Sequence, residues 1–258
     1  MWSDPRVDWA SYAAVVLRST WDYTQRLDEF LAWAERVGAL TQLWNPASVV
    51  RWNSHKSYLL DLDRAGVPVV PTRVCADLPS ALAAVRASGW SRAVVKPAVS
   101  AAGRRTFLID APVGGRKGRW WRVLSNAGQL LAQPYLEEVE RSGERSLVYF
   151  RGRYSHAFLR APHLASGSHL QEGARVLPTR AEREVGHRTM ACLCDAPLYA
   201  RVDVVADATG SPRLMELEAI EPFLGLSSSA PAAARFARAI ARSLQEPPWR
   251  GSGSAGRV

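Results

Sequence analysis

Residues 201–218 read Arg-Val-Asp-Val-Val-Ala-Asp-Ala-Thr-Gly-Ser-Pro-Arg-Leu-Met-Glu-Leu-Glu, with an alternating apolar run on either side of a turn. This pattern predicts a β-hairpin. Glu216 and Glu218 are two residues apart and share a strand face, and Asp203 on the partner strand is expected to face them. Carboxylates about 4 Å apart repel by roughly 4 kcal/mol at an effective dielectric of about 20, so this arrangement requires a cation. Hard oxygen ligands of this kind suit Mg²⁺ or Mn²⁺, and a solvated hairpin face is the alternative.

The composition is that of an ordinary globular chain. With 258 residues and 47% hydrophobic content, it is long enough for one large or two small domains. The apolar runs are shorter than a membrane span and the N-terminus has no signal-peptide pattern, so we expect a soluble cytoplasmic protein. Cys75, Cys192 and Cys194 are too few for a disulfide framework, and no His or Cys cluster completes a zinc site.

The formal net charge of +9 raises the question of nucleic-acid binding, because a basic surface attracts phosphate non-specifically. The basic residues are nevertheless spread along the whole chain. Only residues 116–122 mix basic and aromatic side chains densely, and Trp120 and Trp121 there also fit the buried side of a short helix. A nucleic-acid-binding module is therefore the least favoured hypothesis.

Hydrophobic periodicity separates a small α/β opening from a longer mixture of helices and hairpins. Besides the acidic hairpin, the expected strands are 13–17, 40–44, 93–97, 104–109, 130–136, 146–150 and 153–159. The expected helices are 24–37, 53–65, 77–88, 179–192 and 230–244. Residues 161–178 lack periodicity and are expected to form a mobile loop. This order predicts an α+β fold behind a parallel-sheet domain.

Three segments upstream of the hairpin have features of a nucleotide site. The chain has only three lysines among its 33 basic residues, and one of them, Lys96, ends a strand just before the small-residue turn Ser100-Ala-Ala-Gly103. A compact ammonium and a closely approaching backbone suit a phosphate. Pro134 interrupts the strand Gln133-Pro-Tyr-Leu136, which leaves backbone groups free to bind a purine edge. Glu144 precedes the next strand and is a candidate acceptor for ribose hydroxyls.

In this order the segments resemble the ATP-grasp superfamily over roughly residues 44 to 245. The motifs that carry the resemblance are Trp52-Asn-Ser-His-Lys56, Val94-Val-Lys96-Pro, Gln133-Pro-Tyr-Leu136, Gly143-Glu144, Arg201-Val-Asp203 and Leu214-Met-Glu-Leu-Glu218. The block Leu214–Pro222 and the segment Arg18-Ser-Thr-Trp-Asp-Tyr23 are most similar to the branch of glutathione synthetase and of the cyclo-ligase that closes O-ureidoserine in cycloserine biosynthesis.

The resemblance implies a role for each matching residue. Lys56 and Lys96 would contact ATP phosphates, with Lys96 also near the adenine, and Glu144 would hold the ribose. The adenine pocket would be lined by Gln133, Tyr135 and Leu136. Two Mg²⁺ ions would be ligated by Asp203, Glu216 and Glu218. Arg160 and Arg201 would steady the transferred phosphoryl group while a substrate carboxylate becomes an acyl phosphate that an amine captures.

The resemblance also implies an organisation. The expected fold is an ATP-grasp domain at 56–245, with two α+β subdomains that clamp ATP, after a shortened α/β domain at 1–55 and before a disordered tail at 246–258. Relatives begin with an additional strand and helix, so strand 13–17 is expected to lack a parallel neighbour. His169 stands where relatives carry an Arg that reaches substrate or phosphate.

These departures leave two functional hypotheses for the fold. The first is an ATP- and Mg²⁺-dependent ligase that joins a small, amino-acid-like carboxylate to an amine. The second is an impaired paralogue that only binds nucleotide. Dimers are common among relatives, so a homodimer is also expected.

Overall fold

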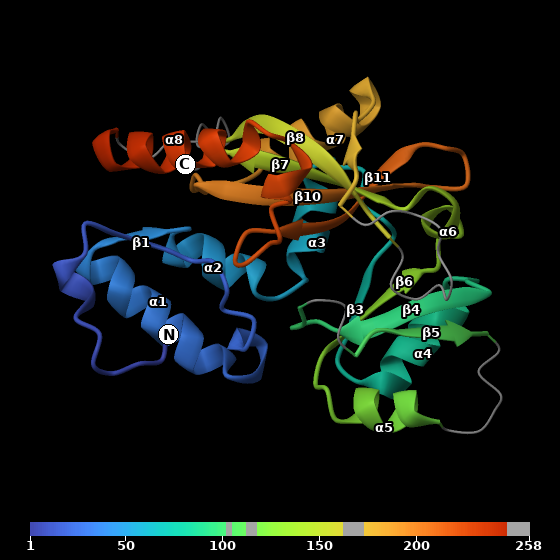
Figure 1. Cartoon of the computed structure of the whole chain (residues 1–258). Coiled ribbons are helices and arrows are strands. Elements are labelled where there is room, and N and C mark those ends of the chain that lie inside the picture. Colours follow the sequence, from blue (N-terminus) through green and yellow to red (C-terminus); the bar gives the residue numbers. More distant parts are fainter. Residues whose placement is uncertain (102–104, 112–117, 162–172, 247–258) are drawn as a thin grey trace, which may run out of the picture.

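The computed structural model describes residues 1–101, 105–111, 118–161 and 173–246. Gly103, His169 and all but the first residue of the expected tail lie outside these ranges. The described residues form three sheets, and the N-terminal part and the four-stranded sheet lie side by side below the five-stranded sheet in Figure 1. None of the described helices is both long and apolar enough to cross a membrane.

The N-terminal part is a two-stranded parallel sheet packed on one long helix. Strand β1 (Ala14–Val16) pairs with β2 (Gln42–Trp44), and α1 (Leu27–Leu40) connects them. The expectation that the first strand lacks a parallel neighbour is therefore wrong. The apolar face of α1 carries Phe30 and Trp33, which pack with Trp2. The short 3₁₀ turns of this part are η1 (Trp9–Ser11) and η2 (Tyr23–Gln25).

The expected helix 53–65 begins later than predicted, because only α3 (Tyr58–Arg64) lies within that range. A separate helix that was not predicted, α2 (Ala47–Asn53), precedes it. Between them, Lys56 N–H donates to Ala98 O at 2.9 Å, a contact with a segment more than 40 residues away. The non-helical segment between α2 and α3 therefore places Lys56 against the end of β4, which is distant in sequence. The local hydrophobic periodicity does not predict that contact.

The four-stranded antiparallel sheet lies in the lower right of Figure 1, in the order β3-β6-β4-β5. Its strands are β3 (Arg73–Cys75), β4 (Arg92–Pro97), β5 (Phe107–Asp110) and β6 (Leu130–Pro134). Helices α4 (Leu78–Ala87) and α5 (Arg119–Ser125) pack on it. The Asp77 side chain accepts from Ser80 N–H at 2.8 Å and caps α4, where the sequence predicts a helix start. Strand β3 was not predicted, because three residues are too few for a periodicity signal.

The five-stranded antiparallel sheet has the order β11-β10-β7-β8-β9. Its strands are β7 (Glu144–Phe150), β8 (Arg153–Arg160), β9 (Arg175–Val176), β10 (Tyr199–Ala206) and β11 (Pro212–Glu218). The expected loop 161–178 therefore ends in a short strand. The remaining elements are α6 (Glu138–Ser142), α7 (Arg180–Ala191), η3 (Leu226–Ser228) and α8 (Ala232–Gln245).

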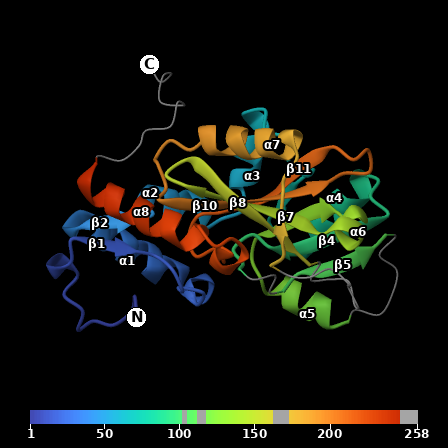
Figure 2. The same cartoon turned by 45° about the horizontal axis from the view of Figure 1, so that its top comes forward.

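Alternating residues of this sheet face two different cores. Leu147 and Tyr149 of β7 pack with α3 and α7. Val148 and Phe150 face the other way and pack with α8 and with β1 and β2. Figure 2 shows α7 and α8 over the strands, with α8 beside β1 and β2. The period of two is the strand pattern that the sequence predicts.

Two buried asparagines join the N-terminal part to the five-stranded sheet. Asn45 Nδ2 donates to Tyr199 O at 2.8 Å and to Ala219 O at 2.6 Å, and its Oδ1 accepts from Leu198 N–H at 2.7 Å. Asn53 Nδ2 donates to Leu217 O and its Oδ1 accepts from Ala219 N–H, both at 2.8 Å. Each amide therefore uses its donor and its acceptor on the backbone around β10 and β11.

Candidate active site

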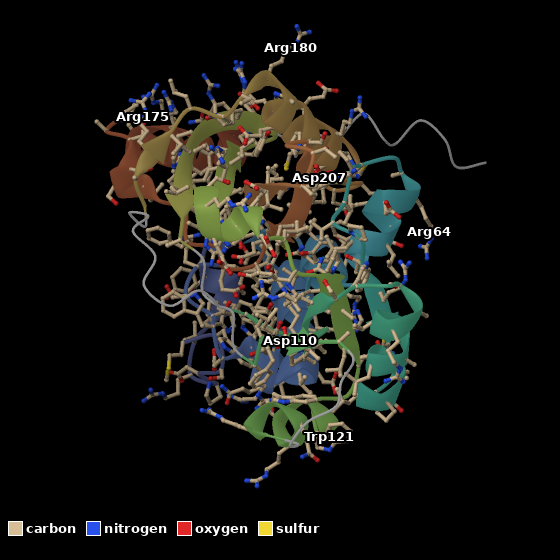
Figure 3. All side chains as sticks on the ribbon, turned by 90° about the vertical axis from the view of Figure 1, so that its right-hand side faces the viewer. Arg64, Asp110, Trp121, Arg175, Arg180 and Asp207 are labelled. Carbon is tan, nitrogen blue, oxygen red and sulfur yellow. The ribbon has the colours of Figure 1, made fainter. Side chains whose placement is uncertain are left out.

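The acidic hairpin is present as the sequence predicts. Strands β10 and β11 are antiparallel, with Asp203 opposite Glu216 and Arg201 opposite Glu218. A bulge follows Asp203, so that Val204 pairs with Leu214 and Met215 is the extra residue. In Figure 3 the label Asp207 shows the turn of this hairpin in the five-stranded sheet, and the label Asp110 shows the end of β5 in the four-stranded sheet. Side chains from both sheets lie between these two labels.

Protein cations offset the repulsion among the hairpin carboxylates. Arg201 donates to Asp203 from Nε at 2.9 Å and from Nη2 at 2.8 Å, and its Nη2 lies 2.6 Å from Glu218 Oε1. Arg160 Nη1 donates to Asp203 Oδ2 at 3.2 Å, and Lys56 pairs with Glu216. In the part of the chain that the structure describes, no three His, Cys, Asp or Glu side chains converge as metal ligands. The cations that the arrangement requires are thus, in the described residues, the side chains of Arg201, Arg160 and Lys56.

A partly open cleft with a cavity volume of about 110 Å³ lies between the four-stranded and five-stranded sheets. Its lining combines apolar side chains with a few convergent charged groups, as small-molecule sites do. The cleft brings together ten of the residues singled out in the sequence: Lys56, Lys96, Ser100, Gln133, Tyr135, Leu136, Glu144, Arg160, Glu216 and Glu218. Asp203 and Arg201 do not line it, because both are buried behind Glu218 and Arg160.

One end of the cleft is apolar and contains the proline-broken strand. Val94, Leu136, Val139 and Met215 line this end. The prediction of free backbone groups here is only half right. Tyr135 N–H donates to Arg92 O at 3.0 Å, whereas Leu136 N–H has no acceptor among the described residues. The Leu136 N–H is thus the backbone donor that remains for a ligand.

Gln133 and Tyr135 are both held in place by neighbours. Gln133 Nε2 donates to Thr72 Oγ1 at 3.0 Å, and the Arg92 guanidinium lies 4.3 Å from the centre of the Tyr135 ring. Burial and the hydrogen bond to Glu140 raise the pKa of Tyr135 to about 12, so its hydroxyl remains protonated near neutral pH.

The two lysines lie at the polar end of the cleft with different partners. Lys96 is 8% exposed and has no acceptor or counterion among the described side chains, and burial lowers its pKa. Burial also opposes the charge of Lys56, but the adjacent Glu216 carboxylate outweighs it and the pKa of Lys56 is raised. An unpaired buried ammonium is costly and suits a site that receives an anion.

The carboxylates of the cleft differ in the direction in which their pKa is shifted. Burial raises the pKa of Glu216, but Lys56 and Lys96 outweigh it and hold that pKa at about 2. Burial and the Asp203 charge raise the pKa of Glu144 to about 7. Burial also raises the pKa of Glu218. Glu216 is therefore the carboxylate most firmly fixed in its charged form.

Three residues near the site were missed by the sequence analysis. Ser146 Oγ donates to Asp203 Oδ1 at 2.6 Å from the neighbouring strand β7, and only the strand register reveals that contact. Tyr23 and Glu221 line a second, smaller pocket beside Lys56, Glu216 and Glu218. Glu221 follows Glu218 by three residues, and this short acidic spacing is the signal that could have found it.

Comparison with known proteins identifies relatives over nearly the whole chain. Residues 1–45 match the family model described as the D-cycloserine synthetase DcsG N-terminal domain. The cycloserine biosynthesis protein DcsG of Streptomyces lavendulae is 38% identical over 266 residues, which cover 95% of this chain and 87% of that protein. The crystal structure of D-cycloserine synthetase DcsG superimposes with a TM-score of 0.82 at 36% identity, covering 94% of this chain and 88% of that one. The ATP-grasp ligase PsnB, complexed with a phosphomimetic variant of its minimal precursor, Mg and ADP, gives a TM-score of 0.60 at 19% identity, covering 89% and 79%.

Proposed function

Since the chain belongs to the family of D-cycloserine synthetase DcsG, whose fold is that of the ATP-grasp ligases, we propose that its cleft binds MgATP and activates an amino-acid-derived carboxylate for ring closure. The chain is an ATP-dependent ligase that uses Mg²⁺ and joins a carboxylate to an amine. What is proposed beyond that is the role of each residue and the class of substrate.

The distribution of apolar and polar residues along the cleft supports one orientation of bound ATP. Its apolar end suits the adenine ring, with the Leu136 N–H as a donor to the purine edge and Gln133 and Tyr135 on the wall. Glu144 is assigned to the ribose hydroxyls. Its pKa of about 7 lets it accept or donate a hydrogen bond near neutral pH. Lys56, Lys96 and the Ser100 turn are assigned to the phosphates at the polar end. Gly103, assigned to the same turn, stays a prediction.

The charges around the cleft fit a nucleotide that arrives with divalent cations. Four acidic side chains, Glu144, Asp203, Glu216 and Glu218, are matched by four basic ones, Lys56, Lys96, Arg160 and Arg201. ATP adds roughly four negative charges to this balanced set, and two Mg²⁺ ions would offset them. The residues present fit the metal by their chemistry, since Glu216 and Glu218 offer carboxylate oxygens at the cleft and phosphate oxygens would complete the ligation.

Glu216 and Glu218 are the carboxylates assigned to Mg²⁺ at the cleft surface. Asp203 is assigned to the same ions from behind them, where it would exchange part of its pairing with Arg160 for the metal. Bound Mg²⁺ would neutralise charge on the phosphates and on the transferred phosphoryl group.

The basic residues around the hairpin suit phosphoryl transfer to a carboxylate. A substrate carboxylate oxygen attacks the γ-phosphorus, the bond to the β-phosphate oxygen breaks, and ADP leaves. The amine then attacks the acyl carbon and inorganic phosphate leaves. Arg160 lines the cleft and is assigned to the transferred phosphoryl group. Arg201, held behind it by Asp203 and Glu218, is assigned mainly to orienting those carboxylates, and its contact with the phosphoryl group stays a prediction.

The observation that carries this proposal is the meeting of two scarce lysines with Glu216 and Glu218 in one cleft. We would measure MgATP binding by calorimetry and ADP release with O-ureidoserine and other amino-acid carboxylates. Glu216→Ala combined with Glu218→Ala is expected to abolish Mg²⁺-dependent binding. The matched control combines Glu35→Ala with Glu184→Ala, since both carboxylates are exposed on helices. Unchanged MgATP binding in the first double variant would refute the metal assignment. Binding without ADP release from any carboxylate would favour the nucleotide-binding alternative.

The division of the chain is also proposed, as an N-terminal domain at 1–55, an ATP-grasp domain at 56–245 and a tail at 246–258. In its support, the core of the N-terminal part draws its residues from 2–50 apart from Ile220, with Ala101 packed against it. A homodimer and a cytoplasmic location remain predictions, tested by light scattering and by cell fractionation.

A further inference from the structure

Glu221 is a buried carboxylate without a counterion. It is 8% exposed, and no described residue lies within ion-pair distance of it or donates a hydrogen bond to it. Its neighbours differ in this respect, because Glu216 pairs with Lys56 and Glu218 pairs with Arg201. Burial, followed by the Glu218 charge, raises the pKa of Glu221 to about 8.

An ionised carboxylate in this position destabilises the folded chain. Removing a charged group from water without a partner costs several kcal/mol, and buried acids are normally paired for this reason. The adjoining hairpin obeys that rule, since all four of its carboxylates have cationic partners. An unpaired acid beside a nucleotide cleft is therefore a candidate for ligand binding.

Glu221 lines a small pocket, with a cavity volume of about 20 Å³, that is distinct from the adenine end of the cleft. Tyr23 of the N-terminal part and Asn53 of α2 contribute to its other side. Five residues, Lys56, Ser100, Ala101, Glu216 and Glu218, line both this pocket and the cleft. The pocket thus adjoins the phosphate end of the cleft, where a substrate carboxylate has to be to meet the γ-phosphate.

Tyr23 presents a second polar group to the same pocket. Its ring packs against Phe30 at a centroid distance of 5.1 Å, which fixes the ring in the N-terminal core. Its hydroxyl has no hydrogen-bond partner among the described residues. Burial and then the Glu221 charge raise the pKa of Tyr23. A neutral hydroxyl oxygen next to a carboxylate provides a second acceptor for a small cation.

The charge balance indicates what kind of cation fits. The four acids and four bases of the cleft are already matched, and MgATP would add no net charge. Glu221 lies outside this matched set and its ionised form would add one negative charge, so a ligand with about one positive charge would stabilise that ionised form. A divalent ion is a poor fit, because it would bring two positive charges to a single carboxylate and Mg²⁺ demands near-octahedral oxygen ligation. A primary ammonium, with three donors, suits the Glu221 carboxylate and the Tyr23 hydroxyl.

We propose that Glu221, assisted by the Tyr23 hydroxyl, binds the primary ammonium group of an amino-acid substrate and so holds its carboxylate toward the phosphate end of the cleft. This inference rests on the proposed ligase function. It assigns Glu221 to selecting an α-amino acid over the corresponding carboxylic acid that lacks the amine.

The test compares two substrates in two enzymes. O-ureidoserine and its analogue with hydrogen in place of the α-amine are assayed with the wild-type chain and with Glu221→Gln, which keeps the shape and removes the charge. We expect the wild type to prefer the amine-bearing substrate at least tenfold in kcat/KM. In Glu221→Gln, KM for O-ureidoserine should rise at least tenfold, while KM for the analogue and the Kd of MgATP should stay within about twofold. Glu221→Asp, which keeps the charge, should recover part of the preference, and Glu184→Gln serves as an exposed control.

Two outcomes would overturn the inference while leaving the ligase function intact. One is a wild-type chain that releases ADP with both substrates equally well. The other is a Glu221→Gln variant in which KM rises equally for both substrates, which would indicate a structural role. If the wild type releases ADP with neither carboxylate, the proposed function fails, and the Kd of O-ureidoserine in the presence of MgADP then decides the Glu221 inference by the same comparison.

Discussion

Replacing Arg201 by Met is expected to cost far more stability than replacing Arg213 on the same hairpin. Arg201 donates to Asp203 at 2.9 and 2.8 Å, lies 2.6 Å from Glu218, and donates to Phe223 O at 3.2 Å. Asp203 is fully buried, and of its partners among the described residues it would keep Arg160 and Ser146. Breaking a buried pair by removing one partner costs about 3 to 5 kcal/mol, because an uncompensated charge remains.

Arg213 provides the matched control. Its Nε lies 2.9 Å from Asp207 Oδ2, about as close as Arg201 lies to Asp203, but the two side chains are 38% and 17% exposed. Solvent screens such a pair, and Asp207 keeps its bonds to Thr209 and Ser211. Arg213→Met should therefore cost less than about 1 kcal/mol.

The assay is urea unfolding followed by tryptophan fluorescence, without nucleotide, on the wild type and both variants. A difference of at least about 2 kcal/mol between the two variants is expected. Equal losses in the two variants, or a loss below about 1 kcal/mol for Arg201→Met, would refute the view that burial makes the Arg201 pairing essential to the hairpin.

Three further predictions concern single groups. The pKa of Glu221 is raised from 4.5 to about 8, so its stabilising contribution is present below pH 4.5 and is lost as the pH rises to 8. Relative to Glu221→Gln, the free energy of unfolding of the wild type should fall by up to about 5 kcal/mol between pH 4.5 and 8, whereas a pH-independent difference would contradict this. Lys96→Met should weaken ATP binding in calorimetry by about 2 kcal/mol without lowering the urea midpoint, since its ammonium has no partner among the described side chains. A lowered midpoint would contradict this. Gly225→Ala should lower the melting temperature more than Gly210→Ala, because both positions have positive φ but only at Gly225 would a Cβ lie 2.4 Å from Phe158. Equal losses would count against this steric argument.

The sequence predicts the parts of the fold that depend on local pattern. The alternation around Asp203 and Glu216 gives the hairpin, and the Asp77 cap gives the start of α4. The ATP-grasp fold, the ligase reaction and the use of ATP and Mg²⁺ are confirmed by the comparisons. The individual site residues stay predictions, although ten of them line one cleft.

What local pattern misses depends on distant contacts. The break between α2 and α3 follows from the bond of Lys56 to Ala98. The pairing of β1 with β2 depends on how α1 packs on the two strands that it connects. The ion pairs of Arg201 and Arg160 with Asp203 depend on the register of the strands. The unpaired state of Glu221 is recognised only once its burial is known, because the sequence does not show whether an acidic side chain is exposed to solvent.

The side-chain hydrogen bonds of Asn45 and Asn53 bear on which part of the molecule we expect to move. Both side chains are hydrogen-bonded to the backbone around β10 and β11, so buried hydrogen bonds join the N-terminal part to the five-stranded sheet. Among the described residues, the four-stranded sheet is joined to these parts by few backbone hydrogen bonds, one of which is Lys56 N–H to Ala98 O. We therefore expect the four-stranded sheet to be the part that moves when the cleft opens to exchange ADP for ATP, and the strands that carry the carboxylates to keep their alignment.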